Sequence, residues 1–441
     1  MKLGNRNGAA LAAVALLAVF AQPACAQLRL PGVQLPQLPQ RTLPQTLGSL
    51  EQAPIEQLTQ LRALRVRALI RGNRHEIDAD RNGAAVVRGV LVAIAPSDAA
   101  LTQIRAAGFD LVDDRVLPGL DLRMVVLRAP ANLGTRAALD KVRKLDPTGA
   151  YDYNHIFDAG GESIAGLAAV QPAAPTDAPT HAPENAPRSP VRVGLIDSGI
   201  DATHPVFSDA SVHMWGCEGH PVPVDHGTAV ASLLVGHSLQ FAGVLPHGEL
   251  YAADVYCGRA TGGAVDVIVT ALAWMIEQRV GVINISLVGP QNLLLGRAVQ
   301  LALARGYIIV AAVGNDGPAA PPLYPAAYAG VVGVTAVDAH RKVLVEACRG
   351  PHVSFAAPGA DMEGAAPGGD FHELRGTSFA APIVAGLLAA KFSAPEPAAA
   401  SERIDELARD AVDLGAPGRD PVYGFGLVGA AYRVPPDSPR R

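Results

Sequence analysis

Residues 191–199 read VRVGLIDSG, and this short stretch decides the fold class of the larger part of the chain. The run from Val193 to Ile196 is continuously apolar, and the turn-forming sequence after Asp197 ends it abruptly. A run without polar alternation suits a strand that is buried on both faces of a parallel sheet, because neither of its faces meets water. The stretch therefore predicts a central strand whose carboxyl end carries Asp197.

Similar continuous apolar runs recur through the second half of the chain. Further runs rich in Val, Ile and Ala lie at 249–256, 280–288, 307–315 and 331–337, with helical stretches between them at 227–236, 265–278 and 293–306. Strands that alternate with helices are typical of an α/β domain with a parallel sheet. In such sheets, ligand and catalytic sites form at the carboxyl ends of the strands.

Four polar residues are placed where strands end or helices begin. Asp197 ends the first strand, and Asn315 follows another buried run. His226 directly precedes an apolar helix, and Ser378, in RGTSFAAP at 375–382, begins a second one. Each alone has an ordinary structural explanation, because serine caps helices and Asp or Asn forms turns. Their shared placement predicts that the four converge on one site.

These residue types suit nucleophilic catalysis. A serine hydroxyl is a poor nucleophile at neutral pH and needs a base that a third group orients. Histidine can take and return a proton near neutral pH, and a carboxylate on its other ring nitrogen fixes the tautomer. An asparagine amide and a backbone N–H can stabilise the oxyanion that forms during the reaction.

The motifs DSG, HGTAVA, GN and GTSFAAP, in this order, resemble those of the subtilisin-like serine peptidases over roughly residues 191–432. The resemblance implies a three-layer α/β/α fold with a mainly parallel sheet, which we place at 191–434. It implies that Ser378 is the nucleophile, His226 the general base and then acid, and Asp197 the group that orients the histidine. It implies that Asn315 donates to the oxyanion, next to the backbone N–H of Ser378.

The resemblance also outlines a substrate cleft. Ser286, Leu287 and Val288 resemble one edge that pairs with an extended peptide, and Gly262 and Gly263 resemble the opposing edge. The family commonly has glycine where Val288 stands, so a β-branched side chain there is expected to crowd one subsite.

The primary pocket is outlined in the same way. Gly314 resembles part of one wall of this pocket, and Asp316 directly follows the oxyanion asparagine. An acidic group at that position leads us to expect a preference for basic side chains at the cleaved position.

A smaller domain is expected over residues 75–156. The pattern between 85 and 155 predicts the order β-α-β-β-α-β of a ferredoxin-like α+β domain. This form resembles the propeptides of the same family, which assist folding and inhibit the enzyme as an intramolecular partner. A Pro/Ala-rich linker follows at 157–190, where we expect maturation to cut, unless the module stays attached.

The N-terminus predicts export. Lys2 and Arg6 precede a short apolar run, and a small-x-small cleavage site precedes Gln27, so residues 1–26 read as a signal peptide. A Pro/Gln-rich segment with a short helix occupies 27–74, and 435–441 form a tail. We expect an extracellular or periplasmic, monomeric protein without a membrane span.

Three cysteines remain after Cys25 leaves with the signal peptide. We expect Cys217 and Cys257, which flank the same candidate site, to form a disulfide, with Cys348 free or bonded between molecules; three unpaired thiols are the alternative.

Charge and histidine spacing bear on partners and metals. The net charge of −5 gives no electrostatic reason to expect a nucleic-acid partner. The resemblance implies no cofactor for the chemistry; many relatives bind structural calcium, but no metal site is assignable from the residue spacing.

The sequence therefore predicts a secreted serine endopeptidase that hydrolyses peptide bonds in proteins through an Asp-His-Ser triad and an acyl-enzyme. A binding or scaffold protein that kept the fold without catalysis is the rival hypothesis.

Overall fold

The computed structural model describes residues 55–159, 161–164, 191–239, 241–392 and 394–435. The chain divides into two units, residues 1–47 and 48–441, and all described residues belong to the second. The predicted signal peptide, the Pro/Gln-rich segment up to residue 54, and positions 165–190 of the predicted linker lie outside the described residues. No helix within the described part combines the length and apolar character needed to cross a membrane.

The N-terminal part is an antiparallel sheet with two helices on one face and a further helix before it. Its elements are α2 (Ile55–Gly72), β1 (Ile77–Ala79), β2 (Ala85–Ile94), α3 (Asp98–Ala106), β3 (Asp110–Leu117), β4 (Leu122–Arg128), α4 (Thr135–Leu145) and β5 (Ala150–His155). The sheet order is β1-β2-β4-β3, with β5 also paired to β2. Ser97 caps α3 by accepting from the N–H of Ala100. The expected β-α-β-β-α-β order from 85 to 155 is present, and the ferredoxin-like prediction is confirmed.

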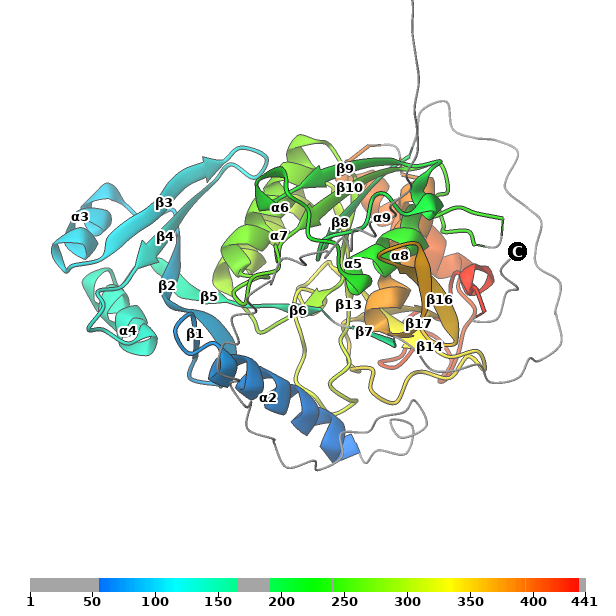
Figure 1. The fold of residues 1–441 in the computed structure, drawn as a ribbon, viewed down its shortest axis with the longest axis horizontal. Helices are drawn as coiled ribbons and strands as arrows, with labels where there is room; N and C mark the ends of the chain where they lie inside the picture. The colour runs from blue at the N-terminus through cyan, green and yellow to red at the C-terminus, as the bar shows by residue number, and fades with distance from the viewer. Residues whose placement is uncertain (1–54, 160, 165–190, 240, 393, 436–441) are drawn as a thin grey trace, which may run out of the picture. The chain divides into compact units, whose positions relative to one another are not determined.

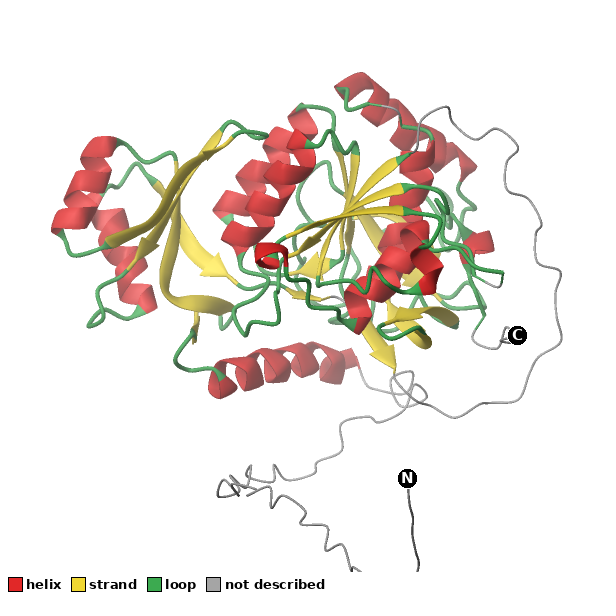
Figure 2. Ribbon diagram, turned by 45° about the horizontal axis from the view of Figure 1, so that its top comes forward, coloured by secondary structure: helices red, strands yellow, loops and turns green. Residues whose placement is uncertain are grey.

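The two central strands of this small sheet, β2 and β4, are mostly buried on both faces. Leu91 and Leu127 belong to a core that it forms with α3 and α4. Val92 and Met124 belong instead to a core shared with α6 (Val265–Glu277) and α7 (Leu293–Ala304) of the larger domain. Figures 1 and 2 show these two helices between the small sheet and the central sheet. The apolar run in β2 is continuous because neighbouring residues pack against different layers.

The larger domain is built on a seven-stranded parallel sheet of order β15-β14-β13-β11-β8-β10-β9. The strands are β8 (Arg192–Asp197), β9 (Ser211–Trp215), β10 (Glu249–Asp254), β11 (Val282–Ile285), β13 (Ile308–Ala312), β14 (Val332–Val337) and β15 (Val353–Pro358). Helices α6 and α7 cover one face. Helices α5 (Asp225–Val235) and α8 (Thr377–Ala390) cover the other, and α9 (Pro397–Asp410) packs against α8.

Alternate residues of each central strand face opposite layers. Leu195 and Ala252 pack with the α5 and α8 side, whereas Ile196 and Ala253 pack with the α6 and α7 side. The expected α/β/α class with a mainly parallel sheet is therefore confirmed, and so is burial of the strands on both faces.

The strands differ from the sequence pattern in detail. The run at 280–288 divides into β11 and β12 (Leu287–Val288), because only its first part pairs with the parallel sheet. Strands β9 and β15 were not anticipated. β9 lies at the sheet edge and carries exposed polar residues, so it lacks the apolar texture of the inner strands.

Smaller elements surround the carboxyl edge of the sheet. They are β6 (Asp158–Ala159), β7 (Gly161–Ile164), β16 (Met362–Ala366), β17 (Asp370–Gly376) and the short 3-10 turns η1 (Pro205–Phe207), η2 (Cys217–Gly219) and η3 (Ala430–Tyr432). β6 pairs with β12, and β7 pairs with β17, both antiparallel. The chain that follows the small domain therefore pairs, through β6 and β7, with strands of the larger domain.

Candidate active site

Three of the four predicted residues form one chain of hydrogen bonds. Nδ1 of His226 lies 2.8 Å from Oδ1 of Asp197, and Nε2 lies 2.9 Å from Oγ of Ser378. All three side chains are buried. Because a carboxylate only accepts, Nδ1 carries the proton and Nε2 accepts from the serine hydroxyl. This is the arrangement that a hydroxyl nucleophile requires for deprotonation.

The fold brings these residues together from separate elements. Asp197 is the last residue of β8, at the carboxyl edge of the sheet, while His226 and Ser378 lie in the first turns of α5 and α8. Oδ1 of Asp197 also accepts from the N–H of Ser198, which fixes the carboxylate. Its Oδ2 is buried and has no hydrogen-bond partner among the described residues.

Ser378 is not the cap of its helix. The N-cap of α8 is Gly376, whose φ of 143° favours glycine, and its backbone leads into Thr377 and Ser378. The ordinary explanation that this serine caps the apolar helix is therefore not what the structure shows. Its backbone N–H is one of the free donors of the first helical turn, where the helix dipole favours negative charge.

Asn315 lies beside this helical turn and its amide is oriented. Its Oδ1 accepts from the N–H of Thr377 at 3.1 Å, so its two Nδ2 protons remain for other acceptors. The neighbouring Gly314 donates its N–H to Oγ1 of Thr377 at 3.1 Å. The two bonds fix the end of β13 against the start of α8.

Ser286 supports the nucleophile's backbone rather than facing the cleft with its side chain. Its Oγ donates to the carbonyl of Ser378 at 2.9 Å and accepts from Nδ2 of Asn284 at 2.9 Å. Both side chains are fully buried. Ser286 was predicted to lie in the substrate edge, and its bond to the Ser378 carbonyl was not predicted.

The predicted cleft is occupied by the chain's own segment after the small domain. Asp158 and Ala159 pair antiparallel with Val288 and Leu287. On the opposite side, the N–H of Phe157 donates to the carbonyl of Gly263 at 2.9 Å. The segment thus lies between the two edges that the sequence predicted, paired with one as β6 and bonded to the other through Phe157.

The same segment continues past the nucleophile. β7 begins at Gly161, which pairs with Gly376, two residues before Ser378. The predicted linker began at residue 157, but residues 158–159 and 161–164 form the strands β6 and β7. The small domain therefore runs directly into the cleft, and the Pro/Ala-rich stretch follows the cleft instead of preceding it. Short strands that pair only with distant segments leave no periodic pattern in the sequence.

Glycine is required at two cleft positions. At Gly263, with φ +74°, an added β-carbon would lie 2.4 Å from the carbonyl oxygen of Phe157. At Gly289, it would lie 2.5 Å from the Phe157 ring. Phe157 is fully buried in this niche, and its carbonyl accepts from the hydroxyl of Tyr256 at 2.7 Å. Gly262, the other predicted glycine of this edge, directly precedes Gly263 in the same turn.

Arg62 of α2 was not anticipated by sequence reasoning. Its guanidinium donates to Oδ2 of Asp316 at 3.0 Å and to the carbonyl of Val288 at 3.4 Å. It also lies 3.7 Å from a carboxylate oxygen of Asp158. An arginine that precedes the small domain by several residues thus reaches both the cleft segment and the residue after Asn315. Nothing in the local sequence indicates this contact.

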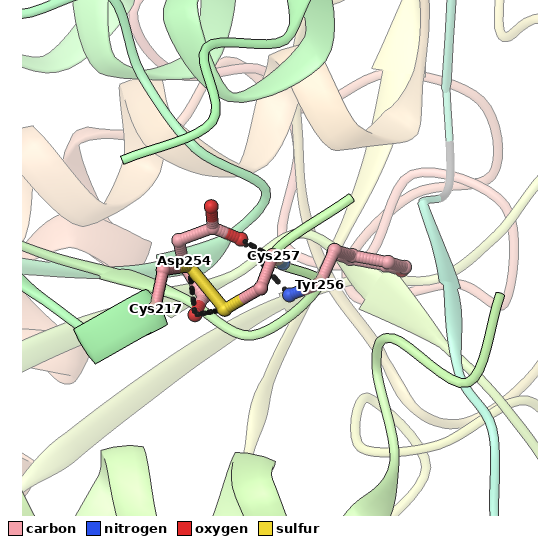
Figure 3. Close-up of a disulfide and its surroundings, with 4 residues drawn as sticks. All are labelled: Cys217, Asp254, Tyr256 and Cys257. Atoms are coloured by element: carbon pink, nitrogen blue, oxygen red, sulfur yellow. Dashed lines mark hydrogen bonds between the residues drawn. A yellow bond between two sulfur atoms is a disulfide. The ribbon is translucent and has the colours of Figure 1, made fainter. Parts of the chain in front are cut away.

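The structure contains the disulfide between Cys217 and Cys257 (Figure 3). It joins η2 to the turn after β10, where Oδ1 of Asp254 accepts from the N–H groups of Tyr256 and Cys257. Cys217, Asp254 and Cys257 are the one group of three potential metal ligands in the described part of the chain. The disulfide bond already engages the sulfurs of both cysteines. Cys348 is free and buried, and burial raises the pKa of its thiol to about 12.

The comparisons with known proteins identify the family of the chain. A model of the subtilase family, Peptidase_S8, matches residues 188–426. Subtilisin E of Bacillus subtilis (strain 168) is 31% identical over 311 residues, which cover 68% of this chain and 78% of the relative. Subtilisin Savinase of Lederbergia lenta is 35% identical over 249 residues, covering 55% and 90%.

A solved structure shares the fold. Fervidolysin from Fervidobacterium pennivorans, described as a keratinolytic enzyme related to subtilisin, superposes with a TM-score of 0.66 at 20% identity. The match covers 81% of this chain and 63% of that one. Fold and relatives together define a serine-type endopeptidase. The chain belongs to the subtilase family.

Proposed function

We propose that this serine protease is a secreted endopeptidase whose catalytic residues are Ser378, His226, Asp197 and Asn315. The observation that carries the proposal is the unbroken set of hydrogen bonds from Asp197 through His226 to Ser378, at 2.8 and 2.9 Å. Asp197 fixes the tautomer that leaves Nε2 as the base. The substrates are proteins or peptides bound in extended form.

The reaction proceeds in two halves. Ser378 Oγ attacks the scissile carbonyl carbon while its proton moves to Nε2 of His226, and the oxyanion accepts from Nδ2 of Asn315 and the N–H of Ser378. The C–N bond then breaks, His226 returns the proton to the leaving amine, and an acyl-enzyme remains. Water repeats the sequence, releasing the carboxyl product and the free serine. No step requires a metal; calcium, where bound, serves stability only.

The first substrate is the chain's own segment in the cleft. β6 ends at Ala159 opposite Leu287, the neighbour of Ser286, which is bonded to Ser378, and β7 begins at Gly161 opposite Gly376, two residues before Ser378. We place the first cut after residue 160. Until it departs, the N-terminal domain then acts as an intramolecular inhibitor, because its last strand fills the substrate edges.

Export is part of the proposal. The apolar N-terminus with its small-x-small site supports a signal peptide, and a disulfide between Cys217 and Cys257 suits an oxidising compartment. We place the enzyme outside the cytoplasm as a monomer.

Self-cleavage tests the catalytic assignment. The chain is produced from residue 27 under oxidising conditions and its intact mass is followed with time, beside Ser378→Ala and the control Ser211→Ala, an exposed serine of β9. We expect a cut after residue 160 in the parent and the control, and none in Ser378→Ala. Cleavage that persists in Ser378→Ala would overturn the catalytic assignment.

A further inference from the structure

The space beside the oxyanion asparagine is filled by side chains of the protein itself. Gly314 has φ +99°, and a β-carbon added there would lie 2.5 Å from Cδ1 of Leu323. It would lie 3.5 Å from both Sγ of Cys348 and Cγ1 of Val288. Three side chains therefore converge on the position that a side chain at residue 314 would occupy.

This filled space adjoins the reacting position of the cleft. Gly314 is bonded to Thr377, the neighbour of Ser378, and directly precedes Asn315. Val288, which borders this space, pairs with Asp158 of the bound segment, and the next residue of the segment, Ala159, pairs with Leu287. The residue that follows Ala159 is the one whose carbonyl Ser378 attacks under the proposed function.

The filling side chains are held in place. Leu323, Val288 and Cys348 are all buried. The backbones behind them are joined, because Gly289 and Tyr324 exchange two hydrogen bonds of 2.9 and 3.0 Å. A large substrate side chain could enter only by displacing a packed leucine, and dense packing resists such displacement.

We infer that the primary specificity pocket is closed by Leu323 and Val288, so that the enzyme cleaves after glycine or alanine and rejects large or charged residues. The inference rests on the proposed function and adds the substrate class. It also matches the chain's own segment, since residues 159–161 read Ala-Gly-Gly. The closed pocket also opposes the preference for basic side chains expected from Asp316, because Leu323 leaves no room for a long side chain beside Gly314.

Substitutions at residue 160 of the full chain test the inference. We compare self-cleavage rates of the parent with Gly160→Ala, Gly160→Phe and Gly160→Arg by intact mass. Alanine should cleave within a few-fold of the parent. Phenylalanine and arginine should slow cleavage by at least about 10-fold. The loss typical of one misfitting group in a pocket is roughly 10- to 200-fold.

The decisive experiment enlarges the pocket by shortening the side chain of Leu323. Leu323→Gly combined with Gly160→Phe should recover most of the lost rate, and Leu323→Ala, which leaves a smaller cavity, serves as the second variant. Each Leu323 variant is also measured with Gly160 present, to show that it folds and cleaves.

The outcomes separate the two levels of the argument. If Gly160→Phe cleaves as fast as the parent, or if neither Leu323 variant restores its rate, the closed pocket is refuted and the protease assignment stands. If the parent itself fails to cleave, or cleaves equally as Ser378→Ala, the proposed function fails and the inference falls with it. Slow Gly160→Phe with rescue at Leu323 supports both.

Discussion

At the scale of single residues, the bond between Asn315 and the start of α8 has a direct consequence. Because Oδ1 accepts from Thr377, the amide cannot rotate without losing that bond, and Nδ2 stays available as a donor. A donor that is oriented before the reaction stabilises the oxyanion without reorganisation.

Asn315→Ala should therefore lower kcat strongly with little change in KM. The equivalent asparagine of subtilisin is the standard case, and its loss costs about 2.7–4 kcal/mol of transition-state stabilisation, or roughly 10²–10³ in kcat. Steady-state kinetics on a peptide substrate with alanine immediately before the cleaved bond would measure both kcat and KM. A loss smaller than threefold in a variant of unchanged melting temperature would contradict the role.

Ser286 acts through structure and not through the reaction. Ser286→Ala removes the bond to the Ser378 carbonyl and deprives Nδ2 of Asn284 of its acceptor in a fully buried position. An unsatisfied buried polar group costs about 1–3 kcal/mol, so the free energy of unfolding should fall by that amount. Denaturant unfolding in the uncleavable Ser378→Ala background measures it, with exposed Ser211→Ala as the neutral control. Equal stability of the two variants would show that the Ser286 bond contributes nothing.

Some residues of this site could be predicted from the sequence, and others could not. Asp197, His226 and Ser378 each sit at a strand end or helix start that local pattern reveals, and the order of motifs linked them. Arg62 and Leu323 carry no such mark. Arg62 matters through its bond to Asp316, 254 residues away along the chain, and Leu323 through the way the loop after Gly314 folds back on it. A single sequence contains no signal for contacts of that kind.

At the scale of elements, helix α2 forms a second attachment between the N-terminal part and the cleft. Its partly buried Val66, Leu69 and Ile70 pack against a small core that includes Ile77 and Ile156. The Arg62 side chain is only 16% exposed, and it contacts Asp158 of the bound strand together with Val288 and Asp316 of the larger domain. Helix α2 thus adds a charged contact to the main-chain pairing of β6.

Arg62→Ala should shorten the interval between self-cleavage and the appearance of peptidase activity. A partly buried hydrogen bond to a charged group contributes about 1.5–3 kcal/mol, so release of the cleaved N-terminal part should accelerate by about 10-fold or more. The lag is read from a peptide assay beside mass spectrometry of the cut. Arg67→Ala, an exposed arginine on the same helix, is the matched control. An unchanged lag in Arg62→Ala would show that the ion pairs do not retain the helix.

At the scale of the whole molecule, the apolar pattern of β2 in the small domain bears on how the two domains pack. The continuous apolar run of β2 is typical of a strand buried on two faces, yet such burial was predicted only for the strands of the parallel sheet. Val92 packs towards α6 and α7, so the second face is covered by the other domain. Periodicity can show that a face is covered, but it cannot show which element covers it.

A buried polar network also joins the two domains. Nδ1 of His155 accepts from Nδ2 of Asn292 at 3.0 Å, and its Nε2 faces Oδ2 of Asp80 at 3.3 Å. Oδ1 of Asn292 caps α7 by accepting from Leu294 and Leu295, which fixes the direction of the amide. The network therefore couples the end of β5, just before the cleft segment, to a helix of the larger domain.

Asp80 gives this network a pH dependence with a definite sign. Burial raises the pKa of Asp80, but hydrogen bonds from His155 and from the N–H groups of Ala84 and Asn82 outweigh it, so the pKa is lowered from its ordinary 3.8. A carboxyl whose folded pKa is depressed adds stability above its unfolded pKa, and that stability is lost as the pH falls through the folded pKa. The contribution should be fully present at pH 5–7 and should fade below about pH 4.

Asp80→Asn should therefore destabilise the precursor at pH 7 and much less at pH 3. Denaturant unfolding of Ser378→Ala chains with and without the substitution measures the difference, and exposed Asp110→Asn serves as the control because it should show no comparable pH-dependent gap. A gap of equal size at both pH values would mean that the ionised carboxylate is not what Asp80 contributes. Since His155 lies three residues before β6, the same variant should also release its N-terminal part sooner after self-cleavage, and the two effects should diminish together as the pH is lowered.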